Sequence, residues 1–133
     1  MRNDFRHYTF NSIFTLENYT NEITLIENDL EENQLIRANQ LIQNTNNNIQ
    51  NILNTLSEAS TNWSVSRIGK AERSCLILGI SELLLNLTPK KIIVAEWTKL
   101  VDKHSTSDGA KFVNAILDNI SKNNDISKWN IHN

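Results

Sequence analysis

The sequence predicts an all-α protein, and three observations point to this fold class. Only three glycines and one proline occur among 133 residues, too few for the tight turns of a β-sandwich or barrel. Leu, Ile, Glu, Lys and Asn dominate the composition, which favours helices. Apolar residues also recur at spacings of three and four along most of the chain. At this length we expect one domain, residues 1–133, with a real hydrophobic core.

The first expected helix covers residues 4–16. Phe5, Ile13 and Leu16 lie on one stripe of this helix, whereas Phe10 and Phe14 lie roughly opposite. Either the helix is sandwiched between two packing layers, or it presents the aromatic pair to a partner. Because large aromatic side chains are usually buried, the first alternative is favoured.

Residues 17–34 carry six carboxylates and no basic residue around a weak apolar set. We expect a short amphipathic helix there, with a solvated acidic face. A heptad stripe follows and predicts a long helix over residues 33–58. Its members are Leu35, Ala38, Ile42, Thr45, Ile49, Ile52, Leu56 and Ala59.

Asparagines crowd the outer face of this long helix and predict local fraying, since Asn is a poor helix former. A coiled-coil homodimer would also explain the heptads. About four heptads with a polar Thr45 fit better with packing inside a bundle.

Small polar residues over 57–64 connect an N-terminal half, residues 1–60, to a C-terminal half, residues 63–133. Trp63 is expected to anchor a short turn, and Arg67 leads into the next helix. That helix, residues 71–87, has almost no polar face and should lie at the centre of the domain. Glu72 and Glu82 are expected to be capping or buried-pair carboxylates.

Thr88 and Pro89 predict the start of another helix, with Thr88 as N-cap. One face of this helix carries Ile93, Trp97, Leu100, Val101 and His104. Residues 105–108 should end it and cap the next helix. The latter should bury Phe112 or Val113, and residues 125–129 should form a last turn.

Charge and motifs limit the function. Residues 1–62 have three arginines against eight carboxylates, a charge of −5, whereas residues 63–133 have ten cations against seven carboxylates, +3. This asymmetry indicates either a nucleic-acid face on the second half or ordinary surface charge. No phosphate loop, CxxC, HExxH or GxSxG motif occurs, so we expect a binding protein and no enzyme, cofactor or metal site.

The place in the cell follows from composition. The single cysteine, Cys75, lies in an apolar segment and is expected to be a buried, unreactive thiol. No apolar run approaches the length of a membrane span, and the N-terminus lacks a signal-peptide core. We therefore expect a cytoplasmic protein without membrane contact.

The C-terminal half carries an ordered set of motifs: Arg67-Ile68, Glu72-Arg73, Glu82-Leu83, Pro89 and residues 111–118, KFVNAILD. This set resembles the NusB family, small helical RNA-binding factors of bacterial transcription antitermination and ribosomal RNA synthesis. The motifs cover about sixty residues, and Arg6 and Phe14 match the family more faintly. The resemblance implies a NusB-like fold of two packed three-helix bundles.

The resemblance also implies a function: binding of single-stranded boxA RNA together with NusE, a small-subunit ribosomal protein, in the transcription elongation complex. By position, the RNA contacts would be Arg2, Arg6, Asp108, Lys111 and Phe112. Phe14 and Glu72 would face NusE. Spacing alone equally allows Phe14 and Phe112 to be core residues.

Two other functions remain open. One is a protein-docking module, the role that NusB-type domains have when fused to RNA methyltransferases. The other is a homodimer formed through the acidic half, as some relatives show, which can hide the RNA surface.

Overall fold

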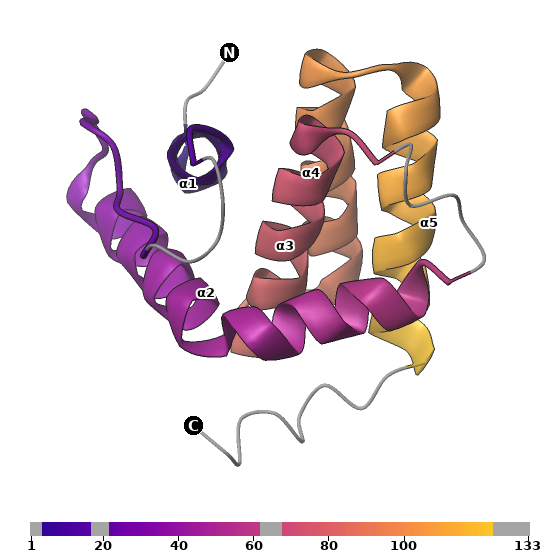
Figure 1. Cartoon of the computed structure of the whole chain (residues 1–133). Helices are drawn as coiled ribbons and strands as arrows, with labels where there is room; N and C mark the ends of the chain where they lie inside the picture. Colours follow the sequence, from indigo (N-terminus) through magenta and orange to yellow (C-terminus); the bar gives the residue numbers. More distant parts are fainter. Residues whose placement is uncertain (1–3, 17–21, 62–67, 124–133) are drawn as a thin grey trace.

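The computed structural model describes residues 4–16, 22–61 and 68–123, and within these ranges the regular structure is entirely helical (Figure 1). The helices are α1 (Phe5–Phe14), α2 (Glu32–Ala59), α3 (Lys70–Leu85), α4 (Lys90–His104) and α5 (Ser107–Asn123). The all-α prediction is thus confirmed. Arg2, Trp63, Arg67 and residues 125–129 lie outside the described ranges, and what was expected of them stays a prediction.

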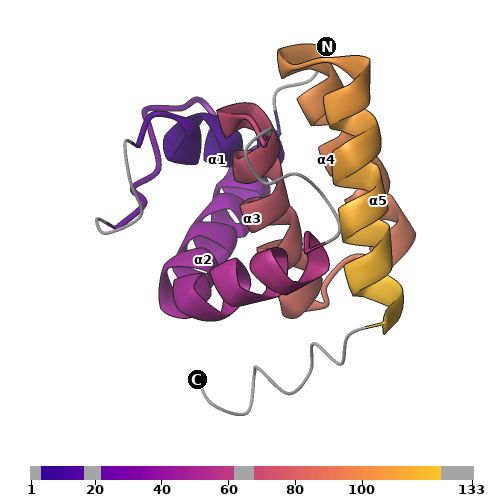
Figure 2. The same cartoon turned by 45° about the vertical axis from the view of Figure 1, so that its right-hand side comes forward.

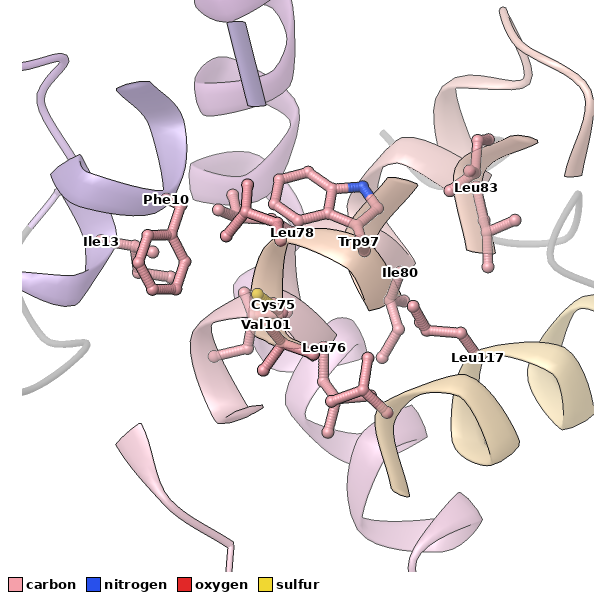
Figure 3. Packing of buried hydrophobic residues seen from close by; sticks show 14 of the residues in the cluster. Phe10, Ile13, Cys75, Leu76, Leu78, Ile80, Leu83, Trp97, Val101 and Leu117 are labelled. Carbon is pink, nitrogen blue, oxygen red and sulfur yellow. The ribbon is translucent and has the colours of Figure 1, made fainter. Parts of the chain in front are cut away.

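Helix α3 lies at the centre, with the other four helices packed against it or against its neighbours (Figures 1 and 2). Every residue from Ser74 to Leu84 is buried, as expected for a helix without a polar face. The helix ends at Leu85, two residues before the predicted end, because Asn86 turns into the left-handed conformation at φ 54°. Figure 3 shows side chains of α1, α3, α4 and α5 meeting in this core.

Helix α1 lies between α2 and α3, and Figure 1 views it along its axis. Asp4 caps the helix by accepting hydrogen bonds from the backbone N–H groups of Arg6 and His7. Phe5, Phe10 and Ile13 are all buried. The sandwiched alternative is therefore the correct one for Phe10, which is not presented to a partner.

Residues 22–31 are not helical, so the amphipathic helix expected there is wrong. The side-chain amide of Asn46 in α2 makes two hydrogen bonds with the backbone of Ile23. Its Oδ1 accepts from the Ile23 N–H at 2.8 Å, and its Nδ2 donates to the Ile23 carbonyl at 3.0 Å. The Ile26 N–H donates to Ser12 Oγ at 3.0 Å. Side chains of other elements thus satisfy the backbone groups that a helix would have paired.

Helix α2 bends at Asn48, whose φ of −120° and ψ of 18° leave the helical range. Its first arm lies beside α1, and its second arm crosses beneath α3 towards α5 (Figure 1). Asn48 is 2% exposed, and its Nδ2 donates to the Asn44 carbonyl at 2.9 Å. The expectation of an outer, fraying asparagine face was wrong at Asn48, which is buried and hydrogen-bonded to Asn44 within a continuous but bent helix.

The heptad stripe of α2 packs inside the chain. Ala38, Ile42, Ile52 and Leu56 are buried in the core. Thr45 is buried as well; its hydroxyl donates to the Leu41 carbonyl at 2.7 Å and lies 2.7 Å from the Ser81 hydroxyl of α3. This stripe serves the bundle, as the sequence favoured, and is not left for a coiled-coil partner.

Helices α4 and α5 form a hairpin that packs on α3 (Figure 2). Helix α4 starts directly after Pro89, although Pro89 itself takes the N-cap position that was expected of Thr88. Thr106 Oγ1 accepts from the Gly109 N–H at 3.0 Å and caps α5. Val113 is buried and Phe112 only half-buried, which settles the alternative between them in favour of Val113.

A glycine brings α3 and α5 into close contact. A Cβ atom at Gly79 would lie 2.8 Å from Cδ1 of Leu117. Helices α3, α4 and α5 together form the bundle of the C-terminal half. Helix α1 and the two arms of α2 pack against this bundle. Among the described helices, none has the length and apolarity needed to cross a membrane.

Candidate nucleic-acid interface

Arg6, a predicted phosphate contact, is buried where α1, α3 and α4 meet. Its Nε and Nη2 donate to the two carboxylate oxygens of Glu82 at 2.8 and 2.6 Å. Trp97 Nε1 donates to the same carboxylate at 2.8 Å. Only 6% of Arg6 is exposed, so its position does not fit the role of a surface cation. Glu82 is a buried-pair carboxylate, as the sequence predicted.

A second arginine joins this cluster. The Arg37 guanidinium lies 4.2 Å from the centre of the Phe5 ring, and that of Arg6 lies 4.5 Å from it. Arg37 Nη2 is 3.7 Å from Glu82 and donates to Thr88 Oγ1 at 2.8 Å. Both described arginines of the N-terminal half therefore take part in internal contacts, although the Arg37 side chain remains 36% exposed.

Phe14, a predicted partner contact, ends a row of rings along one side of α1. His7 and His104 lie 6.5 Å apart between ring centres, His104 and Phe10 4.8 Å, and Phe10 and Phe14 5.2 Å. The Lys70 ammonium lies 5.1 Å from the centre of the Phe14 ring. Phe14 is half-buried, so it packs against the core and still presents part of its ring.

Glu72, the other predicted partner contact, lies at the start of α3 and is 8% exposed. Ser105 Oγ donates a hydrogen bond to its carboxylate, which also lies against Gly109. Glu72 thus joins α3 to the turn between α4 and α5 through a neutral hydroxyl, which is neither the cap nor the ion pair that the sequence suggested. Asp108 is exposed in the first turn of α5, next to this contact.

Lys111 and Phe112 lie on different flanks of α5. Lys111 is exposed and lines a hollow shared with α4. Successive helical residues point about 100° apart, and Phe112, which is half-buried, packs against the core from the other flank. A phosphate contact by Lys111 and a stacking contact by Phe112 would lie on different sides of α5.

Two surface hollows meet at Lys99 of α4. The larger, about 510 Å³, lies between α1 and α4 and is lined by Asp4, Arg6, His7, Glu96, Lys99, Leu100, Lys103 and His104. The smaller, about 350 Å³, lies between α4 and α5 and is lined by Thr98, Lys99, Asp102, Ser107, Ala110, Lys111 and Asn114. One lysine-bearing surface therefore runs from α5 across α4 to α1, and we call it the α4 groove.

Sequence reasoning missed Lys99, Lys103 and His7 of the α4 groove. Lys99 and Lys103 are four residues apart, and this spacing places two helical side chains on one side. That signal was available in the sequence. Carboxylates reduce the net positive charge of the groove. Lys99 Nζ lies 3.2 Å from Glu96, and Asp102 lines the smaller hollow.

Two groups in the described part of the chain have clearly shifted pKa values. The pKa of His104 is lowered because partial burial disfavours its charged form, and His7 and Lys103 repel the added charge. The pKa of the Cys75 thiol is raised by burial and, to a smaller extent, by the Glu72 carboxylate. Within the described residues, no group of three or more His, Cys, Asp or Glu side chains is placed to hold a metal ion.

Comparison with known proteins gives the family. The model of the NusB family matches residues 5–122 of this chain. The chain belongs to the NusB family. Transcription antitermination protein NusB of Clostridium botulinum is 30% identical over 115 residues, which is 86% of each chain. That of Macrococcus caseolyticus is 27% identical over 126 residues, covering 92% of this chain and 97% of the relative.

Shorter matches also occur within the NusB family. The NusB protein of Fusobacterium nucleatum is 33% identical over 93 residues, which cover 70% of this chain and 61% of the relative. Among solved structures, T. maritima NusB superposes with a TM-score of 0.80 over 100% of both chains, at 23% identity. At that identity the likeness concerns the fold alone, and it confirms the NusB-like architecture predicted from the motifs.

Proposed function

We propose that this chain is a transcription antitermination factor that binds single-stranded boxA-type RNA together with NusE in the transcription elongation complex. Its membership in the NusB family supports the antitermination role, because the relatives carry that name. The observation that carries RNA binding is the α4 groove, where exposed Lys99, Lys103 and Lys111 line two hollows that share Lys99.

Single-stranded RNA is bound by a track of cations for its phosphates and by planar side chains for its bases. Lys99 and Lys111 of the α4 groove provide cations on two neighbouring helices. His104 provides a ring face near its α1 end. Phe112 is a second stacking candidate on the other flank of α5, and Asp108 stands at the rim.

Arg6 supports this site indirectly in our proposal. Its buried pair with Glu82 holds α1 against α3 and α4, and this contact positions the wall of the α4 groove that carries His7. Arg2, which precedes α1 and lies outside the described residues, keeps its predicted role as a phosphate contact. The groove also contains carboxylates, which weaken phosphate binding, so RNA binding should depend on a partner.

NusE would dock beside the start of α3. Phe14 presents part of its ring there under the Lys70 ammonium, and Glu72 closes the adjoining α4–α5 turn through Ser105. Aromatic side chains, Phe included, are enriched in the buried centres of protein interfaces. We therefore retain Phe14 as a direct contact and assign Glu72 mainly to shaping this surface.

The test is to mix the chain with NusE and boxA RNA and to measure the mass of the complex by light scattering. We expect a ternary complex, weaker NusE binding for Phe14→Ala, and weaker RNA binding for Lys111→Gln. Lys122→Gln, at the opposite end of α5, serves as the matched control and should bind both partners normally.

Other masses would favour the alternatives. A complex that contains NusE but no RNA would favour the protein-docking function over RNA binding. A chain that has twice its monomer mass and binds neither partner would favour the homodimer that hides the RNA surface. The internal contacts of Arg6 and Arg37, the two described arginines of the N-terminal half, are the specific observation that keeps the docking function in consideration.

A further inference from the structure

Two histidines from distant parts of the chain face one another in the larger hollow of the α4 groove. His7 belongs to α1 and His104 ends α4, and their ring centres are 6.5 Å apart. Both line the hollow. His104 also stacks on the buried Phe10 ring, which fixes the plane of its imidazole at the groove wall.

The charged neighbours of this pair come from both helices. Lys103 adjoins His104 on α4, and the Lys99–Glu96 pair lies one turn earlier. On α1, the carboxylate of Asp4 accepts hydrogen bonds from the first N–H groups of its helix and lies 3.8 Å from Arg6. Arg6 is itself neutralised by Glu82. The cationic forms of two imidazoles and Lys103 would thus be close together, a repulsion that an anion in the hollow would relieve.

We propose that the His7–His104 pair is a proton-controlled part of the RNA site, which binds a phosphate of single-stranded RNA more tightly when the imidazoles are protonated. The inference rests on the proposed RNA-binding function and adds its regulation by pH. In the neutral form, the pair offers planar faces continuous with Phe10. In the protonated form, it adds up to two positive charges to the lysines of the groove.

The direction of the effect follows from linkage. Burial and the neighbouring cations lower the pKa of His104 in the free protein. A phosphate placed against the pair favours the protonated form, so RNA binding is accompanied by proton uptake. Affinity therefore rises as pH falls through the pKa of the complex, by up to about tenfold per pH unit for each proton taken up, and levels off below the pKa of the free protein.

A structural explanation competes with this one. If His104 served only as a flat ring packed on Phe10, any aromatic side chain would replace it without changing the pH dependence of RNA binding. His104→Phe separates the two, because it keeps a ring over Phe10 and removes the titrating group. His7→Asn removes the other, half-buried imidazole from α1.

The experiment measures Kd for an oligouridine RNA by fluorescence anisotropy between about pH 5 and 8, the range in which histidine titrates, at constant ionic strength. Uridine takes up no proton in this range. We expect the unaltered protein to gain affinity as pH falls, and His104→Phe to lose at least half of the slope of log Kd against pH. Lys122→Gln, at the far end of α5, is the control and should keep the slope of the unaltered protein.

The outcomes separate the two proposals. RNA binding that does not change with pH, or a slope that survives in both His104→Phe and His7→Asn, overturns the proton-controlled site and leaves the RNA-binding function standing. If the unaltered protein binds no RNA at any pH, either alone or with NusE, the proposed function fails and this inference with it. Circular dichroism at each pH ensures that only folded protein is compared.

Discussion

Arg6 and Glu82 are 76 residues apart in the sequence and form a buried bidentate pair, with donor–acceptor distances of 2.8 and 2.6 Å. The pair joins α1 to α3, and Trp97 adds α4 by donating to the same carboxylate. Glu82→Ala would leave the Arg6 guanidinium buried without its counter-charge. We expect this variant to lose about 3–5 kcal/mol of unfolding free energy, measured by urea denaturation.

A double variant serves as the control for this pair. Arg6→Met combined with Glu82→Leu removes both charges and keeps apolar volume, so it should be clearly more stable than Glu82→Ala alone. Lys99→Ala, which breaks the exposed pair with Glu96, should cost less than about 1 kcal/mol. Equal losses for Glu82→Ala and Lys99→Ala would show that the buried pair does not hold α1 in place.

The core around α3 is tested by Leu78→Ala. Leu78 is fully buried and lies near Trp97 in Figure 3, so truncation should cost about 2–5 kcal/mol through lost burial and the remaining cavity. Ile92→Ala, at a helical position that is 48% exposed, is the matched control and should change stability by less than about 0.5 kcal/mol. A loss below that limit for Leu78→Ala would contradict the central position of α3.

Cys75 should be unreactive in the folded protein. Burial and the Glu72 carboxylate raise the pKa of its thiol, and only the thiolate attacks a disulfide reagent. We expect reaction with an aromatic disulfide to proceed no faster than unfolding, and to become fast in concentrated urea. Complete reaction of the folded protein within the mixing time would mean that the thiol is accessible.

His104 should make stability depend on pH. Its pKa is lowered in the folded protein, whereas an unfolded histidine titrates at about 6.5. The unfolded chain therefore binds more protons in this window, and stability is lost as pH falls from about 6.5 towards the folded pKa. His104→Phe should show a smaller fall in Tm between pH 7 and 5. An identical fall in both proteins would argue against the lowered pKa.

The helices were predictable where their burial produces a recognisable pattern of apolar residues along the sequence. Residues 74–84 lie on all sides of a buried helix, so their near-continuous apolar run indicated the centre of the fold. The heptads of α2 likewise predicted its length to within one residue at each end. The bend at Asn48 was not predicted: Asn48 donates to Asn44 within α2, and Asn44 in turn donates to Ser81 of α3, a contact that no local window contains.

The site was harder to predict for the same physical reason. An arginine near the N-terminus has the same local pattern whether it meets a phosphate or a buried carboxylate, and only the fold places Glu82 against Arg6. Segment 22–31 contains apolar residues suited to a helix. Its backbone N–H groups instead donate to the side chains of Asn46 and Ser12. The His7–His104 pair arises from the approach of α1 to the end of α4, which spacing along the chain does not reveal.

The most direct test of the RNA-binding surface is the salt dependence of RNA affinity for Lys111→Gln, measured by anisotropy with NusE present. Lys111 is exposed in the α4 groove, so its loss should weaken binding to all single-stranded RNAs alike. It should also reduce the slope of log K against log salt by about 0.7, the counterion release for one single-strand phosphate. Lys122→Gln, whose lysine pairs with Asp118 at the far end of α5, should keep the full slope. A Lys111→Gln protein with unchanged affinity and unchanged salt slope would contradict the assignment of this surface to RNA.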